Sequence, residues 1–297
     1  MDPESVHGEL RFFYLLFGSA KKNEEMKKRL HSASGFTLVE LLVVIAIVGL
    51  LASLLLPALA KARNRARMIE EMSAARQLML AVQMYADDYN GGMFPGYVAN
   101  PAVVDDLGHP LVFPANARYP WRIVPYVRGS MPLMYSGVNR AKLRELQSQS
   151  HADYVYAVSL FPSLGINSYF IGGNQTEFPA SIANATFGAG TVVTKISEAR
   201  RASDLIVFIS ARSAVSGDNA QGYYQVTPPY LTSRKWAADY SDSLSPSQWG
   251  FVAPRFESRA VAAMLDGHAE LLNSQQMQDM RHWCDRADRA DWMLTPK

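Results

Sequence analysis

The sequence predicts an α+β protein in which a long N-terminal helix packs on an antiparallel, β-rich globular domain. Three observations support this fold class: a continuous apolar run over residues 36–60, an apolar stripe with helical spacing over residues 68–86, and short apolar runs separated by Pro, Gly, Asn and Ser after residue 93. The chain has 297 residues, 48% of them hydrophobic, which suits one globular domain together with an anchor.

The apolar run begins at Phe36 and ends at Ala60, and Glu40 is its only charged residue. As an α-helix these 25 residues would be about 37 Å long, enough to cross a bilayer. Because the run is apolar on all sides rather than along one stripe, a membrane segment is a better interpretation than a core helix. Pro57 lacks a backbone N–H, so we expect it to kink the helix or to melt it locally.

Glu40 lies one turn inside this apolar block, where a charged side chain is costly. One interpretation is that its carboxylate reaches the headgroup region and remains solvated. The other is that the carboxylate has a partner, or marks a pathway through the membrane. The position of Glu40 alone leaves both interpretations open.

The sequence around Glu40 resembles the class III signal of type IV prepilins and type II secretion pseudopilins. The shared features are Lys27-Lys28-Arg29, a short polar spacer, Gly35, Phe36-Thr37-Leu38-Val39-Glu40 and the apolar run. The resemblance implies that a prepilin peptidase cuts after Gly35 and N-methylates the new N-terminal Phe36. It also implies that Glu40 pairs with the Phe36 amine of a neighbouring filament subunit, so that two buried opposite charges compensate each other. Pro57 stands where such proteins often have a helix-breaking proline.

The resemblance also orients the chain across the membrane. Basic residues alone do not decide the orientation, because five lie within residues 21–29 and four within residues 61–67. The implied parts are a cytoplasmic leader (1–35), a membrane-spanning and filament-core helix (36–60), its amphipathic continuation (61–92) and an extracytoplasmic β-rich domain (93–297). Met26 is the expected start of translation, which would make residues 1–25 an upstream extension.

A helical apolar stripe follows the membrane segment, and we expect it to pack against a sheet rather than to form a partner-binding groove. It consists of Met68, Met72, Ala75, Met79, Val82 and Ala86, widened by Ile69, Leu78 and Tyr85. The helix should end at Asn90-Gly91-Gly92, with Pro95 just beyond. Asp87, Asp88 and Asn90 offer oxygen ligands for calcium, but a polar helix end explains them as well, and we expect no metal there.

Five apolar runs in the remaining chain are interpreted as strands or buried extended segments. They are residues 121–127, 154–158, 168–171, 205–210 and 223–226. Residues 140–148 are expected to form a short surface helix, and residues 172–190 a loop.

The clearest local pattern is a hairpin, in which residues 259–265 and 268–272 flank Asp266-Gly267. This pair suits a type I′ turn, whose two central residues both need positive φ. Asp266-Gly267-His268 is therefore interpreted as turn chemistry rather than as a catalytic or metal-binding group.

Asn273 and Gln276 resemble a capping pair for a final helix that extends to about Ala290. The lone cysteine of the chain, Cys284, rules out an intrachain disulfide. A buried, inert thiol is the interpretation we favour for it, ahead of a free or an intermolecular one.

The hairpin region extends the family resemblance. Pilin-like proteins of planctomycete- and verrucomicrobia-type bacteria often combine a prepilin signal with a tail of the form Arg-His-x-Gly-x-Ala, five further residues and Asp-Gly-His. The corresponding segments here are Arg255–Ala260 and Asp266–His268. Phe256 stands where that family commonly has His, and Ser258 where it has Gly, so any role of that histidine does not carry over.

Two function classes are compatible with these features. The first is a pilin-like structural subunit, or pseudopilin, of a type II secretion or type IV pilus-like filament, held in the inner membrane by a single span. Its implied partners are a prepilin peptidase, other pilin or pseudopilin subunits, the inner-membrane assembly platform and membrane lipid. The alternative is a membrane-tethered extracytoplasmic binding or adhesion module that does not polymerise.

An exported enzyme is a third and weaker interpretation. Reactive groups are present at Asp266, His268, His109 and His151, but no spacing links them into a nucleophile elbow, a zinc pair or a phosphate-binding loop. We therefore expect no enzymatic activity, cofactor or metal. The formal net charge of +2 gives no indication of nucleic-acid binding.

Overall fold

The structure, a computed structural model, describes residues 37–127, 133–136, 139–216, 218–220 and 222–297. The chain divides into two compact units, Met1–Pro57 and Ala58–Lys297. The expected leader lies outside the described residues, and with it Gly35 and Phe36.

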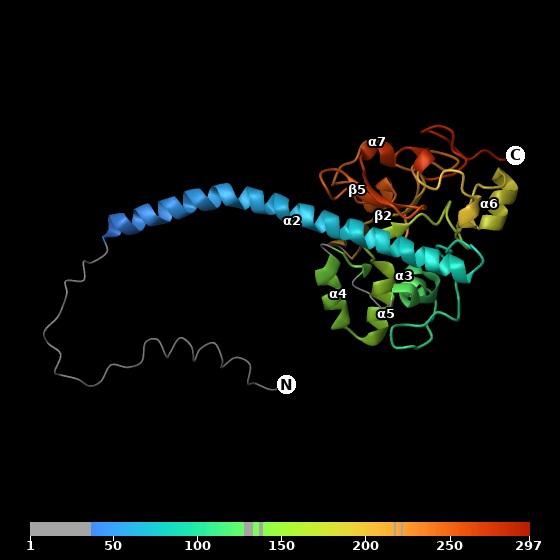
Figure 1. The fold of residues 1–297 in the computed structure, drawn as a ribbon, viewed down its shortest axis with the longest axis horizontal. Helices are drawn as coiled ribbons and strands as arrows, with labels where there is room; N and C mark the ends of the chain where they lie inside the picture. The colour runs from blue at the N-terminus through green and yellow to red at the C-terminus, as the bar shows by residue number, and fades with distance from the viewer. Residues whose placement is uncertain (1–36, 128–132, 137–138, 217, 221) are drawn as a thin grey trace. The chain divides into compact units, whose positions relative to one another are not determined.

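The described elements confirm the α+β class (Figure 1). The helices are α2 (Leu38–Asp88), α3 (Tyr119–Ile123), α4 (Asn139–Gln147), α5 (His151–Leu160), α6 (Ala180–Phe187) and α7 (Ser274–Met277). The strands are β1 (Leu164–Ile166), β2 (Ile206–Ser210), β3 (Ser213–Ser216), β4 (Asp218–Ala220), β5 (Ala260–Met264) and β6 (Ala269–Leu272).

Helix α2 contains 51 residues and has Pro57 in its interior. The helical backbone continues through Pro57, so the local melting that this proline could cause does not occur in this structure, and a kink stays a prediction. By length and composition α2 can cross a membrane, and no residue of its most apolar 18-residue window is buried.

The C-terminal end of α2 confirms the expected stop signal. Asn90 and Gly91 have positive φ values of 53° and 75°. The Gly91 N–H donates a hydrogen bond to the Ala86 carbonyl at 2.7 Å. This left-handed turn satisfies helix carbonyls that would otherwise lack a partner.

The second half of α2 packs through the expected stripe. Ala75, Leu78, Met79, Val82 and Ala86 are buried, and Met68, Met72 and Tyr85 are partly buried against the same core. Ile69 was wrongly included, because it is 59% exposed. The stripe also contains a buried acid, Glu71, that the apolar pattern did not predict.

The main sheet has the strand order β1-β2-β5-β6, and all of its neighbouring pairs are antiparallel. Strands β1, β2 and β5 are buried along their whole length, because both faces of the sheet are covered, while β6 is partly buried at its centre. Val207 and Phe208 of β2 belong to a core that includes the α2 stripe and residues of α3 and α5. Ile206 and Ile209 belong to a second core, with Trp236, Trp249 and Trp283. In Figure 1 the C-terminal half of α2 accordingly passes between helices α3–α5 and the C-terminal strands.

Of the five apolar runs, residues 205–210 form the expected strand, β2, and residues 223–226 are a largely buried extended segment. Two of the runs are helical instead. Residues 121–127 lie in α3 and in a 3₁₀ turn (Val124–Val127), and residues 154–158 lie in α5. Short buried runs do not distinguish a helix from a strand, and here a Pro in the first turn of α3 and the Ser150 N-cap of α5 favour helix.

Two further segments differ from the expectation. Residues 168–171 form a buried turn rather than a strand, and β1 lies just before them in the chain. Residues 172–190 are not all loop, because α6 occupies Ala180–Phe187. The short helix expected over residues 140–148 is confirmed as α4.

The hairpin of β5 and β6 is confirmed, but the type I′ turn is wrong. Of the two expected central residues, only Gly267 has positive φ, at 98°. Met264 N–H donates to the His268 carbonyl, and Gly267 N–H donates to the Met264 carbonyl, both at 2.9 Å. The loop therefore has three residues, Leu265–Gly267, with glycine in the left-handed position. The amides of Leu265 and Asp266 donate instead to Leu205 and Ala202, which fixes this longer loop.

The capping pair of the last helix is confirmed, because Asn273 and Gln276 bond reciprocally. The helix itself ends at Met277 instead of near Ala290. Trp283 Nε1–H donates to the Met277 carbonyl at 2.8 Å, and this buried indole takes the acceptor that a further helical turn would need. Cys284 is free and buried as expected, and burial raises the pKa of its thiol to about 12.

Candidate functional site

The first turn of α2 carries Glu40, which the sequence singled out. The Thr37 N–H and Thr37 Oγ1 donate to Glu40 Oε2 at 2.8 and 2.9 Å, and the Glu40 N–H donates back to Thr37 Oγ1 at 3.2 Å. This reciprocal pair is a capping box, in which a threonine before the helix and a glutamate at its third position satisfy backbone N–H groups. The carboxylate also lies at the positive end of the helix dipole.

The capping box was missed in the sequence, although Thr-x-x-Glu at residues 37–40 is its pattern. It engages one carboxylate oxygen of Glu40, Oε2. Pro57 does not lie near Glu40, since 17 helical residues separate them by about 26 Å. The structure thus pairs Glu40 with Thr37 and leaves Pro57 as a separate feature of the same helix.

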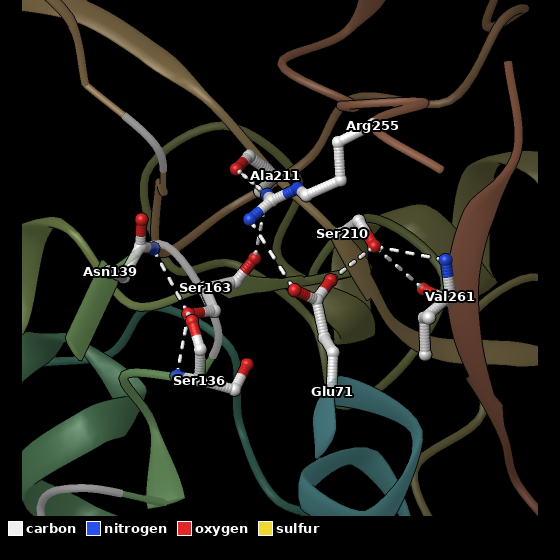
Figure 2. A network of polar contacts seen from close by, with 8 residues as sticks. All are labelled: Glu71, Ser136, Asn139, Ser163, Ser210, Ala211, Arg255 and Val261. Atoms are coloured by element: carbon white, nitrogen blue, oxygen red, sulfur yellow. Dashed lines mark hydrogen bonds and ion pairs between the residues drawn. The ribbon is translucent and has the colours of Figure 1, made fainter. Parts of the chain in front are cut away.

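A second acid on α2, Glu71, is fully buried where the helix meets the sheet (Figure 2). The Ser210 hydroxyl at the end of β2 donates to Glu71 Oε1. Arg255 Nη1 lies 3.4 Å from Glu71 Oε2. Ser210 Oγ also accepts the Val261 N–H of β5 at 2.9 Å, so the carboxylate is joined to two adjacent strands.

Arg255 extends this network away from the helix. Its Nη2 donates to the carbonyls of Ser163, at 3.2 Å, and Ala211. The Ser163 hydroxyl in turn accepts the Ser136 N–H at 3.0 Å and the Asn139 Nδ2 at 2.9 Å. Arg255 therefore joins α2 to the residues just before β1 and just after β2, and Ser163 continues the network to Ser136 and to the first residue of α4 (Figure 2).

The surroundings of Glu71 disfavour the charged form of its carboxyl group. Burial raises the pKa of Glu71, and the nearby Arg255 guanidinium and the Ser210 hydroxyl offset only part of that rise. A buried ion pair of this kind positions groups more than it stabilises them, because removing two charges from water is costly. We infer that the network fixes the rotation of α2 on the sheet.

Neither partner of this ion pair was assigned a role from the sequence. They are 184 residues apart, and no local pattern connects them. A signal for Glu71 existed, because residues 71, 75, 78 and 82 share one helical face with the stripe. For Arg255 the only signal was its place in the tail motif.

The histidines considered for an enzyme fall into two groups. His268 Nδ1 lies 2.6 Å from Asp266 Oδ1 in the exposed hairpin loop, as turn chemistry predicts. His109 and His151 were not linked by any sequence spacing, yet the structure brings both to the buried carboxylate of Asp105. Asp105 was not identified from the sequence, because it lies 46 residues from His151 and no local pattern connects the two.

Comparisons with known proteins agree with the N-terminal features. Residues 30–56 match the family described as the prokaryotic N-terminal methylation motif. Over 79 residues, 27% of the chain, the sequence is 38% identical to the Type IV wide pilus major component PilA4 of Thermus thermophilus. That match spans 56% of the relative's length, and no solved structure matches the chain. The chain thus carries a prepilin-type methylation motif and is similar to a type IV pilin over part of its length.

Proposed function

We propose that this protein is a pilin-like structural subunit that a prepilin peptidase cuts after Gly35 and N-methylates at Phe36. The observation that carries the proposal is the methylation motif at residues 30–56. It includes Glu40, the one charged residue of the apolar run over residues 36–60, which forms the first part of α2. The mature subunit then assembles through residues 36–60, whose apolar faces pack in the core of a filament.

The proposed location is the inner membrane, crossed once by the first half of α2, with the β-rich domain on the extracytoplasmic side. Exposed leucine, valine and isoleucine side chains along residues 38–56 support this placement, since such a surface is suited to lipid or to other apolar helices. The proposed partners are the peptidase, neighbouring pilin or pseudopilin subunits and an inner-membrane assembly platform. The filament is of the type II secretion or the type IV pilus class.

Glu40 is proposed to pair with the Phe36 amine of a neighbouring subunit. The capping box supports this role, because it holds the carboxylate in one orientation and engages only Oε2. A carboxylate that already accepts hydrogen bonds costs less to keep in an apolar environment before its charged partner arrives. The ammonium of the neighbour would then supply the compensating charge.

Replacing Gly35 with Leu tests the processing step. The proposal expects the Gly35→Leu chain to keep its leader in cells that cleave the wild-type chain, because the residue before the cut no longer fits the signal. Intact mass of the purified chains is the measurement. Ser34→Ala, beside the cut, is the matched control and should be processed normally. A mature-length product from Gly35→Leu would contradict the cleavage site.

Cysteine crosslinking separates a filament subunit from a solitary membrane-tethered module. Cysteines placed between Leu41 and Leu56, in a Cys284→Ala background, report contacts between apolar helices in native membranes. A filament gives crosslinked ladders beyond the dimer, whereas a tether that does not polymerise gives monomers. Processing with a monomeric result would support the tether.

A further inference from the structure

We propose that Asp105, His109 and His151 bind a divalent transition metal ion of the zinc class. The ligand atoms of these residues lie within 4.8 Å of one another. Asp105 and His109 belong to one tight turn, closed by an Asp105 N–H to His109 carbonyl bond at 3.0 Å, and His151 is the first residue of α5. Two imidazoles and a carboxylate are a ligand set that proteins use for zinc, with a further position left to water.

The Asp105 carboxylate is held so that one oxygen faces both imidazoles. Its Oδ1 accepts the backbone N–H groups of Leu107 and His109 at 2.9 and 2.8 Å. Its Oδ2 lies 3.1 Å from His109 Nδ1 and 2.7 Å from His151 Nε2. One oxygen is therefore fixed by the backbone and the other is presented to two nitrogen ligands, as in metal sites whose carboxylate is oriented by outer hydrogen bonds.

These distances are close to those of a metal-bound set. Zinc bonds of about 2.0–2.1 Å at tetrahedral angles place neighbouring ligand atoms about 3.3 Å apart. The two oxygen–nitrogen distances, 3.1 and 2.7 Å, would have to lengthen by less than about 1 Å, and the three ligand atoms, which lie within 4.8 Å of one another, would have to converge on the ion. Such movement is available, since the side chains of His109 and His151 are 65% and 48% exposed.

The charge of Asp105 is what a metal ion would balance. Its side chain is fully buried, and within the described part of the chain its ion-pair partners are the two histidines, with no lysine or arginine among them. A divalent ion bound by the two imidazoles would place an opposite charge directly beside this carboxylate. Buried carboxylates in proteins are paired with a cation or coordinate a metal.

The ligand types select the class of ion. Imidazole nitrogen suits zinc and its transition-metal neighbours, whereas magnesium and calcium prefer sites built from oxygen alone. The turn is already joined to α5, because the Tyr154 hydroxyl donates to Asp106 Oδ2 at 3.3 Å. Binding would therefore order little of the chain and would fasten the turn at residues 105–109 to α5.

Zinc titration of the full-length chain tests the site. The protein is purified in detergent without a polyhistidine tag, stripped with a chelator and titrated with ZnCl₂ in a calorimeter. We expect one zinc ion per chain at this site, and a Kd at least about tenfold higher in His109→Ala and in His151→Ala. His268→Ala is the matched control, because His268 is also exposed and paired with an aspartate, and no second histidine joins this pair among the residues that the structure describes. It should bind zinc as the wild type does.

Unfolding temperature provides a second readout. Zinc should raise the unfolding midpoint of the wild type and of His268→Ala, and leave that of the double variant His109→Ala/His151→Ala unchanged. Both substituted side chains are largely solvent-accessible, so circular dichroism should show the same fold in all variants. Equal zinc affinity in the wild type and the double variant, or no zinc binding by the wild type, would overturn the proposal. Competition by MgCl₂ at equal concentration would overturn the assigned class of ion.

Discussion

Helix α2 carries two glutamates whose environments are opposite. Glu40 lies in the apolar first half, is exposed, and is satisfied within its own helical turn by Thr37. Glu71 lies in the second half, is fully buried, and is satisfied by Ser210 and Arg255, which are 139 and 184 residues away. One acid thus remains available to a partner from another molecule, while the other has its partners within the chain.

The difference shows how one continuous helix can serve two purposes. In the first half the apolar side chains have no core of their own to enter, which supports their proposed role in a membrane and a filament. In the second half the apolar stripe is buried against the domain core, and the buried Glu71–Arg255 pair joins the helix to the sheet. The five predictions that follow test this contrast.

The largest effect is expected for assembly when the charge of Glu40 is removed. Glu40→Gln can still complete the capping box, since Gln also serves at that position, but it cannot pair with an ammonium. We expect membrane insertion and cleavage to be largely normal and filament formation to be lost, and the same for Glu40→Ala. The measurement is the amount of assembled filament recovered from cells.

Thr37→Ala separates capping from charge. It removes the cap hydroxyl and costs at most about 2 kcal/mol of local helix stability, but it keeps the carboxylate. Assembly should therefore persist. If Thr37→Ala failed to assemble and Glu40→Gln assembled normally, Glu40 would be a capping residue alone.

Arg255→Met is expected to destabilise the globular domain by about 3–5 kcal/mol at neutral pH, because it leaves the carboxylate of Glu71 buried with no opposite charge. The cost should shrink as the pH falls toward 4.5, where Glu71 can take up a proton. Arg259→Met is the control, since Arg259 makes an exposed ion pair with Glu257 and should change stability by less than about 1 kcal/mol. Chemical unfolding of the full chain in detergent measures both, and equal effects of the two variants would contradict the role of Arg255.

Leu78→Ala compares the two halves of α2 directly. Leu78 is fully buried in the core, so its truncation should cost about 2–5 kcal/mol of unfolding free energy. Leu50→Ala, at an exposed position of the apolar half, should leave the unfolding of the domain unchanged. Unfolding monitored by tryptophan fluorescence is suitable, because Trp121, Trp249 and Trp283 are buried in the two cores. Similar losses in both variants would show that the two halves do not differ as described.

Glu71→Gln should have the smallest effect. At pH 4 its unfolding free energy should lie within about 1.5 kcal/mol of the wild-type value, because Gln resembles the protonated acid. Arg255 would keep its two carbonyl acceptors. Since burial raises the pKa of Glu71, the folded chain binds this proton more tightly than the unfolded chain. Wild-type stability is therefore lost as the pH rises from 4.5 through the folded pKa, and the variant should gain on the wild type over that window. If the wild type instead gained stability relative to the variant as the pH rises, the pKa of Glu71 would be lowered in the folded chain.

The parts of the fold that could be predicted from the sequence are those that depend on residues close together in the chain. The stop at Asn90-Gly91, the α2 stripe and the Asn273 cap depend on residues within one or two turns, and these predictions were confirmed. Residues 121–127 and 154–158 were misassigned, because a short apolar run is buried equally well in a helix or a strand. The end of α7 depends on the hydrogen bond from the Trp283 indole to the Met277 carbonyl, and no local sequence pattern predicts this contact.

The same limit applies to the candidate sites. Gly35, Phe36 and Glu40 could be proposed as site residues from the sequence because their signal is contiguous, and residues 30–56 match the methylation motif. The Glu71–Arg255 pair and the Asp105–His109–His151 cluster each join distant segments that become neighbours only when the sheet and helices pack. An acid on an apolar helical face was a usable clue to Glu71, but no use was made of it, and it would not have identified Arg255 as the partner.

Intact-mass analysis of the protein isolated from its native membranes tests the central claim most directly. Our account predicts a chain that begins at Phe36 and carries one added methyl group at its N-terminus. A chain that still carries residues upstream of Phe36 would contradict it.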